Sequence, residues 1–192
     1  KGVESVRIIL KACAEMGVKY LSLYAFSTEN WGRPAGEVDF LMNLFSEKID
    51  QEIDELMENR VRMRFLGRLD QFSPLLQKKM AAAMETTKGN DRINLNIMVN
   101  YGGRAEIVDA FRAINNEQLK NEQINEDAIG KHLYTAGMPD PDLLIRTANE
   151  MRVSNFLLWQ IAYAEIYVTP TLWPDFKKEQ LIAAIEEYQK RE

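Results

Sequence analysis

The sequence predicts an α/β fold, in which a mostly parallel sheet carries helices on both of its faces. Short apolar runs alternate with helix-like stretches along the chain, a pattern typical of parallel strands joined by crossover helices. Five such runs are predicted strands: 20–26, 61–66, 93–99, 143–145 and 166–168. No internal repeat, low-complexity stretch or linker interrupts the pattern, and 192 residues is an ordinary domain length, so a single domain over 1–192 is predicted.

Apolar residues at helical spacing and capping residues predict the helices between these strands. An opening helix ends near Gly17, a typical C-terminal breaker. The longest helix is predicted over 37–58, after a polar loop at 27–36, with one apolar stripe along its length. Ser73, which precedes a proline, and Asn125 are predicted N-caps of two further helices, which run to about 86 and 133. The two remaining helices are predicted over 104–114 and 179–189.

Composition narrows the class of protein. The chain is 46% hydrophobic and 28% charged, as in ordinary globular domains, and no apolar run is long enough for a membrane span. A net charge of −5 without a basic stripe argues against a nucleic-acid partner. The single Cys13 cannot form an internal disulfide, which fits a reducing, cytoplasmic compartment. The chain begins with Lys1 and carries no signal peptide, so its start is expected to be cut.

Polar segments are expected to form one rim, because ligands of open α/β sheets bind beyond the carboxyl ends of the strands. We assigned four segments to this rim: 27–33, 100–104, 146–154 and the stretch leading to Glu165. They carry the arginines Arg33, Arg104, Arg146 and Arg152, whose planar forks match the oxygens of a diphosphate. For each arginine alone, pairing with a surface acid is the favoured interpretation. For Arg146 and Arg152 together, anion binding is the favoured interpretation, with Ser154 as a further donor.

Two other residues, Glu165 and Trp31, and the apolar stripe of the longest helix could also serve the site. Glu165 could contribute a carboxylate ligand to Mg²⁺, or it could be an acid paired with an arginine. Trp31 lies in a loop marked by glycine and proline, and such loops often act as lids over a binding site. The stripe on the 37–58 helix is core in most amphipathic helices, but this helix follows the predicted lid directly, so its first turns are predicted to line an apolar tunnel.

Six blocks of the sequence carry a family resemblance. Their order and spacing resemble the conserved blocks of undecaprenyl diphosphate synthases, bacterial-type cis-prenyltransferases, from the first helix to the last residue. The blocks are 23–34 (LYAFSTENWGRP), 100–104 (NYGGR), 145–147 (IRT), 152–160 (RVSNFLLWQ), 164–165 (AE) and 173–176 (WPDF). Undecaprenyl diphosphate synthases lack the paired aspartate-rich motifs of trans-prenyltransferases, and this chain lacks them too.

The resemblance implies a fold, a reaction and partners. It implies a six-stranded, mostly parallel sheet whose first strand is missing from this chain, and a homodimer. It implies an enzyme that elongates an allylic diphosphate, such as (2E,6E)-farnesyl diphosphate, with isopentenyl diphosphate and with Mg²⁺ as cofactor. The product would be a long-chain polyprenyl diphosphate, a membrane-associated lipid carrier for cell wall biogenesis. The enzyme would be cytoplasmic or peripheral at the membrane.

The resemblance also assigns roles to residues. A lid segment, defined here as residues 27–33, is implied to cover the active site, with Asn30 and Arg33 as catalytic residues. Arg146, Arg152 and Ser154 are implied to hold isopentenyl diphosphate, and Glu165 to contribute to Mg²⁺ binding. The lid residues implied to bind substrate are Ser27, Thr28, Glu29, Asn30, Trp31 and Arg33. The residues expected to line the tunnel are Ala25, Leu41, Leu44 and Phe45.

The chain departs from the family pattern in ways that leave an alternative open. The family's first block (MDGNGRW), with its metal-binding aspartate, and its basic tail are absent, so the 192 residues alone are expected to be inactive or nearly so. Asn149 stands where the family has glycine, although asparagine tolerates left-handed geometry. The alternative function is a non-catalytic homologue that serves as a partner subunit. A nucleotide-binding domain is disfavoured, because no GxGxxG or Walker loop is present.

Overall fold

The computed structural model describes residues 2–117 and 123–191. The chain divides into two compact units, which are described separately. The central unit is Lys19–Gly137, and the terminal unit combines Lys1–Val18 with Met138–Glu192. The predicted single domain over 1–192 stays a prediction.

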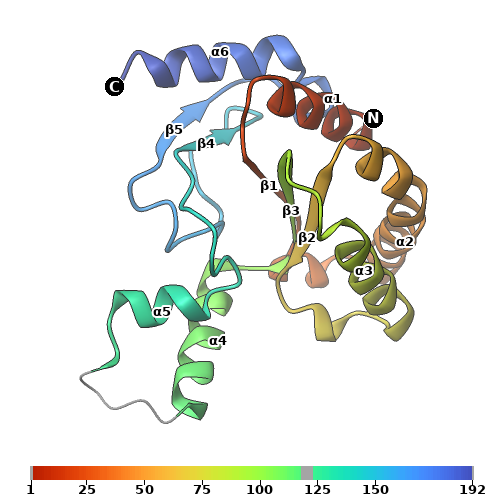
Figure 1. Cartoon of the computed structure of the whole chain (residues 1–192), viewed down its shortest axis with the longest axis vertical. Helices are drawn as coiled ribbons and strands as arrows, with labels where there is room; N and C mark the ends of the chain where they lie inside the picture. The colour runs from red at the N-terminus through yellow and green to blue at the C-terminus, as the bar shows by residue number, and fades with distance from the viewer. Residues whose placement is uncertain (1, 118–122, 192) are drawn as a thin grey trace. The chain divides into compact units, whose positions relative to one another are not determined.

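The central unit is built on a parallel sheet of three strands in the order β1-β3-β2 (Figure 1). Because all three strands run the same way, their carboxyl ends meet at one edge. The strands are β1 (Tyr20–Ser27), β2 (Val61–Leu66) and β3 (Ile93–Tyr101). The helices are α2 (Ala35–Glu58), α3 (Pro74–Thr87), α4 (Gly103–Asn116) and α5 (Glu126–His132), with 3₁₀ turns η1 (Thr28–Gly32) and η2 (Leu69–Gln71).

The middle strand β3 forms the core of this unit. All of its residues except Asn94 are buried, on both faces of the sheet, as a central parallel strand requires. Helices α2 and α3 pack together, and α3 lies against β2, where the backbone N–H of Phe65 points at the Met84 sulfur at 3.4 Å. Val61, Met63 and Phe65 alternate with less buried neighbours, so β2 buries one face.

The terminal unit holds a second, two-stranded parallel sheet. It contains α1 (Gly2–Glu15), β4 (Leu143–Arg146), β5 (Glu165–Val168), the 3₁₀ turn η4 (Trp173–Asp175) and α6 (Lys178–Gln189). Polar contacts fasten the start of α1 to the η4 region. The indole N–H of Trp173 donates to the Gly2 carbonyl at 3.1 Å, and the Ser5 hydroxyl donates to the Pro174 carbonyl at 3.0 Å. These contacts join residues that are about 170 positions apart in the chain.

The predicted α/β class with parallel strands is confirmed, and all five predicted strands are present within two residues of their predicted bounds. The Ser73 and Asn125 side chains accept from the backbone N–H groups of Leu76 and Ala128, as the predicted caps should. Two details differ. The predicted 27–36 loop contains η1 and the start of α2, and the described strands pair as two sheets, not as one six-stranded sheet. Among the described residues, no helix is both long and apolar enough to cross a membrane.

Candidate substrate-binding segments

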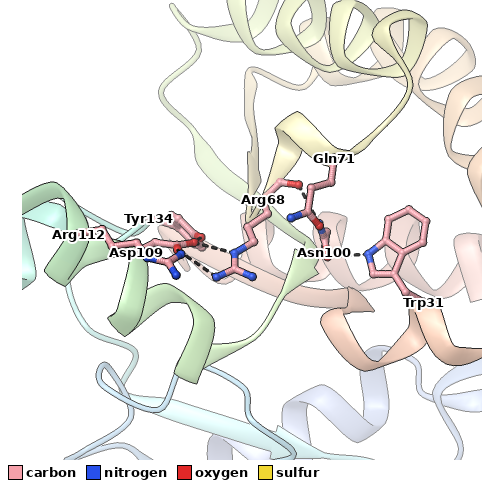
Figure 2. A network of polar contacts seen from close by, with 7 residues as sticks. All are labelled: Trp31, Arg68, Gln71, Asn100, Asp109, Arg112 and Tyr134. Carbon is pink, nitrogen blue, oxygen red and sulfur yellow. Dashed lines mark hydrogen bonds and ion pairs between the residues drawn. The ribbon is translucent and has the colours of Figure 1, made fainter.

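Three segments meet at the carboxyl edge of the central sheet, and Asn100 joins them. Its side-chain carbonyl accepts from the Trp31 indole N–H at 2.7 Å, and its amide donates to the Arg68 carbonyl at 2.9 Å and to Gln71 Oε1 at 2.8 Å (Figure 2). The Asn100 side chain is 1% exposed. The lid segment, the turn after β2 and the end of β3 are therefore held together by one buried amide.

Trp31 is fixed by aromatic packing as well as by this hydrogen bond. Its ring lies edge-on to Phe26, with centroids 5.1 Å apart, and tilted against Phe72 at 5.7 Å. Phe26 and Phe72 are buried, whereas Trp31 remains 39% exposed. One side of the indole is thus packed on the core while the rest faces outward, as expected for a residue that contacts a ligand from a lid.

The other lid residues are engaged locally. The Asn30 side chain accepts from the backbone N–H of Ser27 at 2.9 Å, which closes the first turn of η1. Arg33 pairs with Glu37 at 2.5 Å, and both side chains are nearly half exposed. Such an exposed pair is worth about 0–1 kcal/mol, so an anionic ligand can replace Glu37 at little cost. Ser27 and Thr28 are half-buried and Glu29 is exposed.

The negative charge of Glu29 on the lid segment affects the pKa of the neighbouring Tyr24. The hydroxyl of Tyr24 donates to the Tyr101 carbonyl at 3.1 Å. Burial, reinforced by the negative charge of Glu29, raises the pKa of Tyr24 to about 12. Tyr24 therefore stays protonated and keeps its hydrogen bond to the end of β3 throughout the physiological range.

A close backbone approach sets the position of the turn after β2. Gly67 has φ = 138°, and a Cβ at this position would lie 1.9 Å from the Val99 carbonyl oxygen. The N–H of Arg68 then donates to the Asn100 carbonyl at 3.2 Å. Asn100 itself is left-handed, with φ = 46°, a conformation that asparagine adopts more readily than most residues. Both special positions direct the turn toward the lid segment.

The same turn is anchored on its other side to α4. Arg68 meets Asp109 at two points, and the Tyr134 hydroxyl donates to Asp109 as well (Figure 2). The Arg68 hydrogen bond, against the opposing effect of burial, lowers the pKa of Asp109, and the same hydrogen bond raises the pKa of Arg68. Burial, followed by the bond to Asp109, raises the pKa of Tyr134. All three groups are therefore locked in their ordinary charge states.

In the terminal unit, the segment after β4 carries the predicted diphosphate-binding residues. Its backbone is pinned to the chain after β5 by two hydrogen bonds: Ala148 N–H to the Thr171 carbonyl at 2.9 Å, and Asn149 N–H to the Thr169 carbonyl at 2.8 Å. Asn149 is left-handed, with φ = 55°, a conformation that asparagine tolerates better than most residues. The left-handed non-glycine residues in this stretch are Ala148, Asn149, Ser154, Asn155 and Leu157. Clustered backbone strain of this kind is found preferentially at ligand-binding segments.

The three diphosphate-binding candidates all lie on this segment. Arg146 ends β4 and is half-buried, whereas Arg152 and Ser154 are exposed. The Arg152 side chain is 72% exposed and pairs with Glu150 at 2.7 Å. This is the pairing with a surface acid that the sequence left open as an alternative to anion binding. In solvent this pair contributes little, so it does not prevent Arg152 from binding a ligand with more negative charge.

Glu165 does not lie where we expected it. In the parallel register of the second sheet, Glu165 pairs with Leu143 and Arg146 pairs with Val168. Glu165 is therefore at the amino end of β5, separated by about 10 Å of strand from the carboxyl end that carries Arg146. The prediction that its stretch joins the same rim is wrong, because 156–164 is a series of turns and Glu165 opens the following strand. Its carboxylate pairs with Arg191 at 2.8 Å.

The described residues do not build a Mg²⁺ site by themselves. No group of three or more His, Cys, Asp or Glu residues within 2–117 and 123–191 is arranged to hold a metal ion. Glu165 offers one carboxylate, already neutralised by an arginine. Mg²⁺ is commonly bound through one or two carboxylates plus substrate phosphates, so this lone group is an incomplete ligand set.

The predicted tunnel residues are not fully packed. Along α2, Val38, Ile49 and Leu56 are buried, whereas Leu41, Leu44 and Phe45 are only half-buried. Ala25 on β1 is exposed. Half-exposed apolar side chains on the first turns of α2 are compatible with a lipid-lining surface, and their tunnel role stays a prediction.

Sequence reasoning missed the anchoring residues behind the lid. Asn100 was assigned only as part of a rim segment, and Arg68, Gln71 and Asp109 were not singled out. A glycine and an asparagine that each end a parallel strand, Gly67 and Asn100, were the available signals for special backbone geometry. Their pairing across the sheet was not readable, because it depends on the β2–β3 register.

Comparison with known proteins gives a consistent result. The family model described as "Putative undecaprenyl diphosphate synthase" matches residues 1–192. An isoprenyl transferase of Fusobacterium nucleatum is 50% identical over 192 residues, which are 100% of this chain and 82% of that protein. A farnesyl-diphosphate-specific ditrans,polycis-undecaprenyl-diphosphate synthase of Legionella pneumophila (strain Philadelphia 1) is 45% identical over 99% of this chain and 82% of its own.

A solved structure agrees with the sequence matches. The crystal structure of a probable undecaprenyl diphosphate synthase from Campylobacter jejuni superposes with a TM-score of 0.90 at 36% identity, covering 100% of this chain and 89% of that one. The parallel α/β fold and the arginine-bearing segments are thus those of a cis-prenyltransferase. The chain belongs to the undecaprenyl diphosphate synthase family, as the sequence blocks predicted.

Proposed function

We propose that the protein joins isopentenyl diphosphate to a farnesyl-like allylic diphosphate and repeats the step to make a long-chain polyprenyl diphosphate. The observation that carries this proposal is the 146–154 segment, where two guanidinium groups and a hydroxyl stand on a backbone held in strained geometry. Two forks and a donor suit a diphosphate, whose oxygens accept in-plane pairs of hydrogen bonds. Family membership supplies the reaction class.

In this proposal each segment has a separate task. Arg146, Arg152 and Ser154 bind isopentenyl diphosphate and orient its double bond toward C1 of the allylic substrate. The C1–O bond breaks, diphosphate leaves, a new C–C bond forms, and loss of a proton creates the cis double bond. Asn30 and Arg33 act from the lid segment, and Arg33 donates to the departing diphosphate, where charge develops in the transition state.

Mg²⁺ is proposed as the cofactor on the strength of the family alone. When bound, it would stabilise negative charge on the leaving diphosphate. Glu165 is the proposed contributor of a carboxylate, although its place at the amino end of β5 and its pair with Arg191 argue that other ligands are needed.

A homodimer and a cytoplasmic location, peripheral to the membrane that receives the product, complete the proposal. The apolar residues between 156 and 167 fall into two groups in the structure: Phe156 and Leu157 are buried core, while Tyr163 is 100% exposed and Ile166 is 45% exposed. The two exposed side chains are apolar surface of the kind that partner subunits cover. Light scattering at micromolar concentration that gives the mass of one chain would contradict the dimer.

The decisive experiment is Arg152→Ala in the complete protein. Losing charge-assisted hydrogen bonds worth about 1.5–3 kcal/mol should raise the KM for isopentenyl diphosphate about 10- to 100-fold. Arg60→Ala is the matched control, because Arg60 is a similarly exposed arginine, paired with Asp91 in the central unit. An unchanged KM for Arg152→Ala would remove this segment from the binding site. No elongation by the unmodified protein would favour the alternative, a non-catalytic partner subunit.

A further inference from the structure

A hydrogen bond between Trp31 and Asn100 ties the lid segment to the central sheet. Asn100 lies behind Trp31, 1% exposed, at the carboxyl end of β3. Its Oδ1 accepts from the Trp31 indole at 2.7 Å, and its Nδ2 donates to two acceptors on the turn after β2. Figure 2 shows the amide between the indole and the Arg68–Gln71 turn.

The orientation of this amide is determined by its neighbours. The indole N–H can only donate, so the atom facing it must be the oxygen. The Arg68 carbonyl can only accept, so the atom facing it must be the nitrogen. Both amide hydrogens and one oxygen lone pair are therefore used, and rotating the amide by 180° would break all of these contacts.

The turn that holds Asn100 is itself rigid. Gly67 presses its backbone against Val99, and the Arg68 side chain is held at two points by Asp109 on α4. Trp31 is thus connected through one side chain to two further elements of the central unit. A tether of this kind restrains the outward half of the indole, in addition to the ring contacts with Phe26 and Phe72.

We propose that Asn100 is a positioning residue for the prenyl transfer reaction: through the Trp31 indole it holds the lid segment in the geometry that binds substrate. The inference rests on the proposed role of residues 27–33 in substrate binding. Asn100 is 1% exposed, so in this proposal it acts on the lid segment through its hydrogen bond to Trp31. Misplacing a positioned group by about 1 Å can cost on the order of 100-fold in rate.

A double-mutant cycle tests this coupling in the complete protein. Trp31→Phe keeps an aromatic ring against Phe26 and Phe72 but removes the N–H donor. Asn100→Asp keeps the shape and the tolerance for φ = 46° but places an oxygen against two acceptors. Each change should lower kcat/KM about 10- to 100-fold. The double variant should be no worse than the poorer single one, because both break the same path.

Two further variants keep the test decisive. Asn90→Ala is the control, because the Asn90 amide also donates to a backbone carbonyl, that of Val61 at 2.8 Å, but at the opposite end of the sheet. It should lower the melting temperature and leave kcat/KM within twofold. If Asn100→Asp does not fold, Gln71→Leu removes one acceptor from the exposed side of the tether, and it should lower kcat/KM as well.

A second readout does not depend on activity. In a variant with Trp159 and Trp173 replaced by phenylalanine, acrylamide quenching of Trp31 fluorescence should rise at least twofold after Gln71→Leu or Asn100→Asp. Three results would each overturn the role of Asn100. The first is unchanged quenching, and the second is a double variant whose loss in kcat/KM equals the product of the two single losses. The third is single variants that stay within twofold of the wild-type kcat/KM. Increased quenching in an otherwise inactive protein would instead support the tether and overturn the proposed reaction.

Discussion

Arg68 and Asp109 form a two-point ion pair between the turn after β2 and helix α4. Nε of Arg68 lies 2.8 Å from Oδ2 of Asp109, and Nη2 lies 3.0 Å from Oδ1. The two side chains are 29% and 22% exposed, and Tyr134 donates a further hydrogen bond to Asp109. A pair that makes two hydrogen bonds, is mostly shielded from solvent and is reinforced by a third group is stronger than an ordinary surface ion pair.

We expect Asp109→Asn to lower the free energy of unfolding by about 1–2 kcal/mol, because it weakens charge-assisted hydrogen bonds to Arg68 and Tyr134. Urea denaturation followed by circular dichroism measures the change. Asp91→Asn is the control, since the Arg60–Asp91 pair is about two-thirds exposed and should contribute less than about 0.5 kcal/mol. Equal losses for the two variants would show that burial of the Arg68 pair adds nothing.

The stabilisation from Asp109 should disappear in acid. The folded-state pKa of Asp109 is lowered from its ordinary value of 3.8, chiefly by the hydrogen bond from Arg68. The folded protein thus binds this proton less readily than the unfolded chain, so the stabilisation is complete above the unfolded pKa. It is lost as pH falls through the lowered, folded value. The difference in unfolding free energy between wild type and Asp109→Asn should therefore be constant from pH 7 to about 5 and shrink below about pH 4.

Gly67→Ala should be strongly destabilising. A Cβ at this position would lie 1.9 Å from the Val99 carbonyl oxygen, and φ = 138° is strained for any residue with a side chain. We expect a loss of at least about 2 kcal/mol in unfolding free energy, seen in urea or thermal denaturation. In the matched variant Gly89→Ala, nothing lies within 4 Å of the new Cβ, and the effect should stay within about 0.5 kcal/mol. A tolerated Gly67→Ala would mean that the turn can move away from β3.

Leu41→Trp and Leu44→Trp decide whether α2 lines a lipid tunnel. If these half-buried side chains face a growing prenyl chain, a tryptophan fills tunnel volume, and the product becomes shorter with little loss of stability. If they are core, overpacking should lower stability by about 1–3 kcal/mol without changing product length. Chromatography of dephosphorylated products, together with melting temperatures, separates the two outcomes. Met57→Trp, at the exposed end of α2, should change neither.

The sequence by itself determined the class of fold, the strands and several helix ends. Short runs of three to seven mostly apolar residues between turn signals favour strands, and a serine before a proline favours a helix N-cap. Ser73 and β2 were therefore predicted to the residue. The arginine-bearing blocks were also readable, because guanidinium groups after strand ends suit diphosphates whatever the rest of the fold does.

Only the tertiary structure decided which residues meet. Trp31 and Asn100 are 69 positions apart, and Arg68 and Asp109 are 41 apart, so their contacts depend on strand order and register, which a periodic pattern does not encode. Glu165 depends on register in the same way: it was assigned to the rim with Arg146, but in the parallel register of the second sheet it pairs with Leu143, so its carboxylate opens β5 at the amino end. Local chemistry fixes what a segment is, whereas long-range packing fixes what it touches.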